Sequence, residues 1–582
     1  MLKRIYFAVT VLFTISSGSA QTTFPSNGAP NPVHTIYAFT NANIHVDQDL
    51  TINNGVLVIQ DGKIIAAAEK ATIPSSAIVY NLNGKHIYAS FIDLYSNFGL
   101  AETSPPKDGK KQNAPTEIKK GAYGWNPAIR ADVEAYKEFT YNKEKAIELM
   151  KMGIGLVVTS SKDGIVRGSG ALVHLANQKE NEAIIKDKAA AFYSFKKGNS
   201  PEQYPGSLTG AMALLRQTYY DAKWYKENSA KTEYNISLEA FNSLSTLPAI
   251  FDAGDKYNAL RANTIGKEFG VKYIIKGGGN EYQRIGDIQS TSCKYILPVN
   301  YPDAPDVEDP LDASEVSLAE LKHWELAPTN AAAMESNMIP FCFTSSDLKD
   351  SKQFLPNIRK AILHGLSEKT ALRALTTNPA AFINQSDKIG ALKTGMLANF
   401  FISNKNIFED DAIIYEHWCN GQQSVFEDMN MPDIRGNYKL TSSDGKNFSV
   451  SINGDAAKPS GSIKMDTTKK PLTIIFKNNL ATFTFQYDSS KTARLSSNYN
   501  ALNKTFTGKG QWANGTWFDF NLNFVSADTS KSKPIDKKKN PQVGKVFYPL
   551  CAYGESLPET DGTSKDALNK FKNRYNAILI KD

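Results

Sequence analysis

Histidine is scarce in this chain, with seven copies among 582 residues, and none of them forms an H-x-H pair. Zinc-type ions are held mainly by histidine, cysteine and carboxylate side chains, so the sequence contains no ready-made histidine motif for such an ion. Cysteine is scarcer still, and no C-x-x-C pair is present, which excludes zinc-ribbon and thioredoxin-type motifs. We expect mostly buried thiols at the four widely separated cysteines: Cys293, Cys342, Cys419 and Cys551.

Long apolar runs are also missing. The run from Ile5 to Ile15 is too short to span a bilayer, but it follows Lys3 and Arg4 and precedes small residues that end at Ala20. This order is typical of a signal peptide, so residues 1–20 are predicted to be removed and the protein to be exported, to the periplasm or the extracellular space. We expect no membrane span after cleavage.

Two further absences restrict the function. The net charge of +7 is spread without a long basic block, so no nucleic-acid partner is predicted. No G-x-S-x-G sequence occurs, and no cysteine has an evident histidine partner, so serine or cysteine nucleophile schemes have no support.

The pattern of elements divides the chain, which is too long for one ordinary domain. Strand-like runs and Asn-Gly or Asp-Gly turns fill residues 36–90. Strand-like and helix-like stretches then alternate to about residue 384, as a (β/α)8 barrel requires. Short strand runs return at 431–525, and residues 526–542 form a charged linker.

Three segments resemble the amidohydrolase superfamily. They are FIDLYSN at 91–97, ALRALTTNPA at 371–380 and IGALKTGMLANFFI at 389–402. The chain is most similar to exported amidohydrolases related to imidazolonepropionase and to dipeptidase-type enzymes. The resemblance implies metal-dependent hydrolysis of non-peptide or dipeptide C–N bonds.

The resemblance also implies an α/β fold with a TIM-like (β/α)8 barrel. The expected divisions are a signal peptide at 1–20, a composite β-sandwich from 36–90 and 385–430, the barrel at 91–384, an all-β module at 431–525, and a linker with the start of a possible further domain at 526–582.

The metal ligands that the family uses are mostly replaced. The resemblance implies one or two divalent ions such as zinc, but Tyr95 and Asn97 stand where its first strand carries two histidines. Asp252 and Lys276 stand at the histidine positions after the fifth and sixth strands. Only Asp347, after the eighth strand, matches, and in the family this residue takes the proton from metal-bound water.

The sequence predicts the fourth strand at VVTSS, residues 157–161, after which the family often carries a metal-binding lysine. No lysine stands within this run, and Lys162 follows it. Lys276 would repel a cation. We therefore expect no metal cofactor and a barrel that is inactive by itself.

Other roles remain open for these residues. Asp252, Lys276 and Asp347 are candidates for a buried charge network in place of a metal, and the two carboxylates with a third oxygen are candidates for Ca²⁺ or Mg²⁺. Arg167 is a candidate for binding a substrate carboxylate, because its guanidinium pairs bidentately. The glycines at 277–279 lack the lysine of a phosphate-binding loop and predict a tight turn.

Three functional hypotheses follow. The first is a non-catalytic half that supports a catalytic amidohydrolase half, since the strand-like run at 576–582 resembles the start of another sandwich. The second is an active hydrolase with an unusual metal site on Asp347 and Asp252. The third is a periplasmic module that binds a small-molecule ligand in the barrel mouth.

Overall fold

The computed structural model describes residues 35–101, 126–228, 232–307, 309–429, 432–454, 459–465, 468–477, 479–488 and 491–527. The predicted signal peptide, Cys551, residues 528–542 of the charged linker and the strand expected at 576–582 lie outside these ranges. The three described cysteines are free and buried. In the described ranges, no helix combines the length and the apolar character that crossing a membrane requires.

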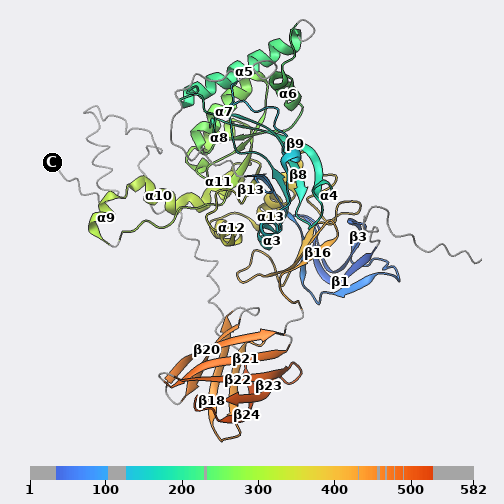
Figure 1. The fold of residues 1–582 in the computed structure, drawn as a ribbon, viewed down its shortest axis with the longest axis vertical. Helices are drawn as coiled ribbons and strands as arrows, with labels where there is room; N and C mark the ends of the chain where they lie inside the picture. Colours follow the sequence, from blue (N-terminus) through green and yellow to red (C-terminus); the bar gives the residue numbers. More distant parts are fainter. Residues whose placement is uncertain are drawn as a thin grey trace, which may run out of the picture.

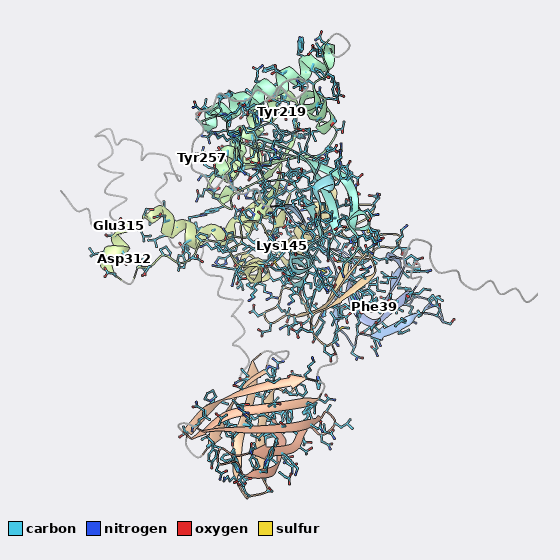
Figure 2. The ribbon with its side chains drawn as sticks, in the orientation of Figure 1. Phe39, Lys145, Tyr219, Tyr257, Asp312 and Glu315 are labelled. Carbon is cyan, nitrogen blue, oxygen red and sulfur yellow. The ribbon has the colours of Figure 1, made fainter. Side chains whose placement is uncertain are left out.

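One eight-stranded sheet is built from the segments that precede and follow the central domain in the sequence (Figure 1). Its order is β16-β15-β14-β5-β1-β2-β3, with β4 beside β1. The bounds are β1 Ile36–His45, β2 Thr51–Gln60, β3 Lys63–Ala68, β4 Ile78–Asn81, β5 His86–Ala89, β14 Phe400–Ser403, β15 Ile414–Cys419 and β16 Gln422–Val425. Strands β5 and β14 are antiparallel neighbours, so segments more than 300 residues apart share one sheet. Phe39, Phe400 and Trp418 pack edge-on or stacked in its core, and Figure 2 labels Phe39 there.

A second eight-stranded sheet forms the central domain, in the sequential order β6 to β13. The bounds are β6 Phe91–Ser96, β7 Ile154–Thr159, β8 Val166–His174, β9 Ile184–Ser194, β10 Ala249–Asp252, β11 Tyr273–Lys276, β12 Lys294–Pro298 and β13 Phe341–Thr344. The two outer strands meet, because Asp93 on β6 accepts hydrogen bonds from the backbone N–H (2.8 Å) and hydroxyl (2.7 Å) of Ser345, just after β13. The sheet therefore curls round on itself as a barrel.

The third strand departs from the predicted (β/α)8 pattern. Strand β8 runs antiparallel to both β7 and β9, whereas the other neighbours in this sheet are parallel. Only residues 160–165 separate β7 from β8, and a parallel crossover needs a dozen residues or more, so a hairpin is the one available connection. The expectation that residues 157–161 belong to the fourth strand is therefore wrong. Residues 157–159 end the second strand, 160 and 161 begin the connection to β8, and β9 is the fourth strand.

Most helices of the central domain cover the outside of this barrel, and one, Pro310–Glu315, extends away from it (Figure 1). The longer ones are α3 Lys143–Lys151, α5 Leu208–Asn228, α6 Ile236–Leu244, α7 Lys256–Phe269, α10 Leu318–Leu326, α12 Phe354–Leu363 and α13 Glu368–Leu375. The shorter ones are α2 Ala135–Glu138, α4 Glu180–Ala183, α8 Ile285–Ser290, α9 Pro310–Glu315, α11 Asn330–Ser336 and α14 Thr377–Phe382. The family-like run at 371–380 spans α13 and α14, where the Asn378 amide donates to the Phe341 carbonyl of β13 at 2.7 Å.

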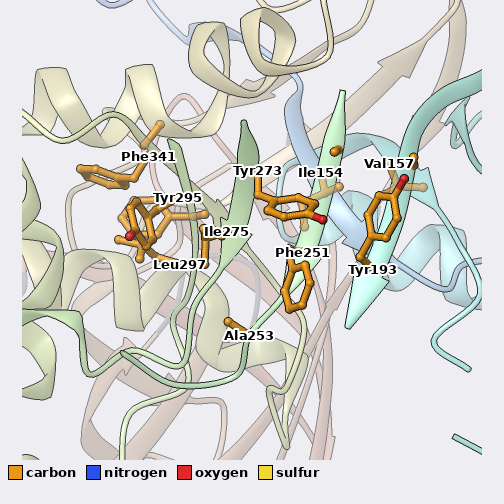
Figure 3. Packing of buried hydrophobic residues seen from close by; sticks show 14 of the residues in the cluster. Ile154, Val157, Tyr193, Phe251, Ala253, Tyr273, Ile275, Tyr295, Leu297 and Phe341 are labelled. Carbon is orange, nitrogen blue, oxygen red and sulfur yellow. The ribbon is translucent and has the colours of Figure 1, made fainter. Parts of the chain in front are cut away.

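Aromatic residues fill the space between the strands and the covering helices. Figure 3 shows Tyr193, Phe251, Tyr273 and Tyr295 projecting from neighbouring strands into this layer. The rings of Phe251 and Tyr273 pack edge-on with centroids 5.0 Å apart. This layer fixes β9 to β12 relative to one another, and so it fixes the residues at their carboxyl ends.

The C-terminal strands form a closed antiparallel barrel of their own. The bounds are β17 Gly436–Ser442, β18 Asn447–Gly454, β19 Pro459–Met465, β20 Thr468–Lys477, β21 Leu480–Asp488, β22 Lys491–Asn500, β23 Thr505–Gln511 and β24 Trp517–Ser526. Strand β24 pairs back with β17, so no edge strand is left. Trp512 is buried and stacks on Phe518 with ring centroids 4.0 Å apart, whereas Trp517 is 67% exposed.

Candidate functional site

A hollow of about 300 Å³ lies at the end of the central barrel where the parallel strands terminate. Four cationic side chains and two carboxylates line it together with neutral groups. The lining residues are Tyr95, Lys162, Arg167, Lys196, Asp252, Gly254, Lys276, Gly278, Pro298, Asn300 and Asp347. Active sites of such barrels form at this end, from residues that follow the strands. We call this hollow the barrel mouth.

Tyr95, Arg167 and Asp252 form a closed hydrogen-bonded group at the base of the barrel mouth. The Arg167 guanidinium donates to the Tyr95 hydroxyl at 2.8 Å, and that hydroxyl donates to Asp252 Oδ2 at 2.8 Å. Arg167 also contacts the same Oδ2 at 3.3 Å, and its Nε donates to the Gly164 carbonyl. Arg167 is 1% exposed and Asp252 is 5% exposed, so the ion pair is fully enclosed.

Lys276 links this group to Asp347. Its ammonium, on a side chain that is 6% exposed, forms a short ion pair with Asp347 Oδ2 and lies 3.9 Å from Asp252 Oδ1. Asp347 is 49% exposed and has a positive φ of 71°, which only a few per cent of non-glycine residues adopt. In the described part of the chain, Asp252 Oδ1 accepts no hydrogen bond. Lys276 thus occupies the space between the two carboxylates.

The Tyr95 ring fills the space above the strand ends. Two ammonium groups lie against it, with Lys162 Nζ 4.9 Å and Lys276 Nζ 5.4 Å from the ring centroid. Cation–π contacts of this kind are worth about 0.5–1 kcal/mol at exposed positions and more when desolvated. Asn97, the other replaced histidine position, follows β6 and is absent from the lining. The structure therefore unites Tyr95, Arg167, Asp252, Lys276 and Asp347, and leaves Asn97 outside.

Burial and charge shift the proton affinities of this group. Burial alone would raise the pKa of the Asp252 carboxyl, but Arg167 and Lys276 outweigh it and hold this pKa below its usual range. Burial raises the pKa of the Tyr95 hydroxyl well above its ordinary value, so the phenol stays protonated. Desolvation of the ammonium by the surrounding protein atoms lowers the pKa of Lys162, although part of its side chain is exposed. The nearby carboxylates of Asp347 and Asp93 partly offset this lowering.

The donor set of the barrel mouth does not fit a divalent metal ion. A metal at this place would meet the carboxylate of Asp252, but Arg167 and Lys276 already contact that carboxylate and carry positive charge. The carboxylate of Asp347 is likewise paired with Lys276. Among the described residues, no three His, Cys, Asp or Glu side chains lie close enough together to hold an ion.

Besides Asn300, the polar residue of the barrel mouth that sequence reasoning missed is Lys196. It follows β9, whose last residue, Ser194, pairs in register with Asp252 of β10. The signal was present, since an apolar run from Ala189 to Phe195 ends at this lysine. It was overlooked because the hairpin of β7 and β8 displaced the count of the strands.

The triple glycine at 277–279 forms the tight turn that the sequence predicted. The backbone N–H of Gly278 donates to Glu281 Oε1 at 2.8 Å, and Glu281 is fully buried. A Cβ at Gly278 would overlap the carbonyl of Gly254 in the neighbouring turn. The amide of Gly278 is therefore used within the turn.

A pair of histidines, separated in the sequence, meets in the first sheet. His45 Nε2 and His86 Nδ1 lie 2.9 Å apart across the parallel strands β1 and β5. Burial, with a smaller effect of His86, lowers the pKa of His45 to about 4. His45 also stacks on Tyr88, so the pair is part of the packing of the sandwich.

These features together define a class by its architecture: a TIM-type barrel with a polar hollow at its strand ends and a sandwich assembled from its two flanks. Residues 325–427 match the model of the amidohydrolase family. This match agrees with the resemblance that the sequence motifs indicate, and it covers the end of the barrel and the strands that follow it.

Solved structures provide the fold comparison. The chain is similar to an amidohydrolase from Thermotoga maritima MSB8, with a TM-score of 0.53 and 20% identity, over 66% of this chain and 99% of that one. The chain is also similar to a prolidase complexed with N-methylphosphonate-L-proline, with a TM-score of 0.41 and 13% identity, over 68% of this chain and 100% of that one. Among curated proteins, none matches this sequence. The likeness to the Thermotoga maritima structure supports a TIM-type barrel in coarse outline.

Proposed function

We propose that this barrel is a non-catalytic member of the amidohydrolase superfamily, in which an internal charge network has replaced the metal centre. The observation that carries the proposal is the connected set of Arg167, Tyr95, Asp252, Lys276 and Asp347. Four of these residues, Tyr95, Asp252, Lys276 and Asp347, stand at strand ends where the amidohydrolases that the sequence resembles carry metal ligands.

The positive charges of Arg167 and Lys276 support this proposal more strongly than the absence of histidine from the family's ligand positions does. A divalent ion beside Asp252 would lie close to both the guanidinium of Arg167 and the ammonium of Lys276, and like charges repel strongly in a poorly solvated site. Water activation by a metal needs an open coordination position and a carboxylate free to take the proton. Asp347 is instead held by Lys276.

The role that remains for the barrel is structural support. We propose that it stabilises a catalytic amidohydrolase half, either in a longer protein or as a partner chain, in an exported protein. The second hypothesis, a metal site on Asp252 and Asp347, requires Lys276 to leave its place between the two carboxylates, and nothing in the contacts favours that.

Metal content tests the proposal directly. The full chain would be purified without chelator and without nickel affinity, and its zinc, manganese and iron would be counted by inductively coupled plasma mass spectrometry. We expect less than about 0.1 ion per chain before and after dialysis against micromolar zinc. Stoichiometric metal would contradict the proposal, particularly if amide or dipeptide hydrolysis appeared and Asp347→Asn abolished it.

A further inference from the structure

We propose that the barrel mouth is a binding site for a small anion, recognised through a carboxylate or phosphate group. This inference goes beyond the supporting role proposed above. It depends on the side chains around the hollow and not on the absence of a metal.

The charge of the barrel mouth favours an anion. Lys162, Arg167, Lys196 and Lys276 line the hollow, against the carboxylates of Asp252 and Asp347. Asp93 lies behind the wall, where it accepts hydrogen bonds from Ser345 and from the backbone of Tyr95. Glu281 likewise lies behind the wall, against the Gly278 amide. Among the residues that line the hollow itself, four cationic groups face two carboxylates, so the lining carries an excess of positive charge. Concave walls concentrate such a field and raise the local concentration of anions.

The cations fall into two groups with different tasks. Arg167 and Lys276 are buried and already paired with carboxylates. Lys162 and Lys196 are exposed, and within the described ranges neither forms an ion pair. The Lys162 ammonium is held by the Ser346 hydroxyl at 3.0 Å and by the Tyr95 ring. We infer that Lys162 and Lys196 bind the anion, while the buried pairs supply a rigid base.

Size and neighbours narrow the ligand. A hollow of about 300 Å³ is at the lower end of ligand-binding pockets, which suits a small molecule rather than a peptide. Asn300, also exposed, adds an amide able to donate or accept a hydrogen bond. Lysine ammonium groups bind both carboxylate and phosphate as point charges, so the two classes must be separated by experiment.

Isothermal titration calorimetry on the full chain provides the test, with inorganic phosphate and succinate as separate probes at constant ionic strength. We expect one saturable site per chain for at least one probe. The double variant Lys162→Gln/Lys196→Gln should weaken that binding at least tenfold. Saturation by phosphate alone would identify a phosphate site, and saturation by succinate alone a carboxylate site.

A matched control removes the same charge from the opposite end of the barrel. Lys272 and Lys294 are exposed and lie at the amino ends of β11 and β12. The variant Lys272→Gln/Lys294→Gln should bind the probe as the unaltered chain does. No saturable binding of either anion, or equal weakening in both double variants, would overturn the proposal.

Failure of the anion-binding proposal can be distinguished from failure of the proposed supporting function. If metal were found, the anion site would still hold provided that Lys162→Gln/Lys196→Gln kept the metal and lost the anion. If no metal were found and no anion bound, only the supporting role would remain.

Discussion

Tyr95 shows how one residue can change what a barrel mouth can hold. Its hydroxyl connects Arg167 to Asp252, and its ring lies against the ammonium groups of Lys162 and Lys276. A histidine in its place would offer a ring nitrogen to a metal, whereas a protonated phenol offers a donor and a large apolar face. Three of the four cations of the mouth therefore contact Tyr95, and Lys196 does not.

The buried ion pair of Arg167 and Asp252 leads to the first prediction. Breaking such a pair leaves an uncompensated charge, so Arg167→Met should lower the free energy of unfolding by about 3 kcal/mol or more. The double variant Arg167→Met/Asp252→Leu removes both charges and should lose less than the sum of the two single changes, with a coupling of at least about 1 kcal/mol. Urea unfolding of the four proteins measures this cycle.

A surface ion pair serves as the control for that cycle. Arg216 and Glu268 are 2.6 Å apart and about one-third exposed. Such pairs contribute roughly 0–1 kcal/mol, so the cycle Arg216→Met/Glu268→Leu should show a smaller coupling. Additive losses at Arg167 and Asp252 would argue against a coupled network. The sequence offered Lys276 and Asp347 as the partners of Asp252 in a buried charge network, but Arg167 lies closer to Asp252 than Lys276 does.

At the scale of elements, the antiparallel β8 brings Arg167 to the mouth. Arg167 is the second residue of β8, and the amino end of an antiparallel strand lies beside the carboxyl ends of its neighbours. The register shifts between Val166 and Ser169, at the bulge that contains Gly168. A bulge changes the direction in which nearby side chains point, and Arg167, whose guanidinium belongs to the buried network, is next to this bulge.

Gly168 carries the second prediction. It has a φ of +79°, and a Cβ there would overlap the carbonyl oxygen of Val133. Gly168→Ala should therefore lower the free energy of unfolding by about 2 kcal/mol or more, through backbone strain and the clash. It should also weaken anion binding, because Arg167 would be displaced. Unfolding and calorimetry of the same preparation check both effects.

The comparison substitution is Gly286→Ala in α8. No atom lies within 4 Å of a Cβ at this position, and the backbone is helical. Alanine is favoured over glycine in a helix by up to about 1 kcal/mol, so the change should be neutral or stabilising. If Gly168→Ala were as harmless as Gly286→Ala, the bulge would not be needed to position Arg167.

The elements also show where sequence reasoning succeeded and where it failed. The positions of Asp252, Lys276 and Asp347 at strand ends could be predicted because each follows a short apolar run with a recognisable frame. Hydrophobic runs do not encode strand direction, so β8 was not foreseen and Lys196 was missed. The length of the connection at 160–165 was the available clue. Hydrogen bonds such as that from Arg167 to Tyr95 join distant positions and have no local signal.

At the scale of the molecule, the sandwich and the barrel are joined by a buried histidine. His417 on β15 has its Nδ1 3.0 Å from the carbonyl of Met150 in α3 and its Nε2 2.7 Å from the Ser90 hydroxyl, between β5 and β6. A carbonyl only accepts, so Nδ1 carries the proton and Nε2 accepts from Ser90. Gly155 on β7 makes room, since a Cβ there would come within 2.6 Å of Nε2.

This joint should make the whole molecule sensitive to acid. Burial lowers the pKa of His417 to about 4 from an ordinary value of 6.5, so the folded state holds the ring neutral. The unfolded state binds the extra proton first, and stability is therefore complete above pH 6.5 and lost as the pH falls toward 4. For this one residue the loss of unfolding free energy between pH 7 and pH 5 is roughly 2 kcal/mol.

The variant His417→Gln, whose amide can both donate and accept, tests this. It should be less stable at pH 7, but its free energy of unfolding should fall by about 2 kcal/mol less between pH 7 and pH 5. Urea unfolding at pH 7 and pH 5 measures the difference, and equal pH dependence in the two proteins would show that the imidazole between the sandwich and the barrel does not set it.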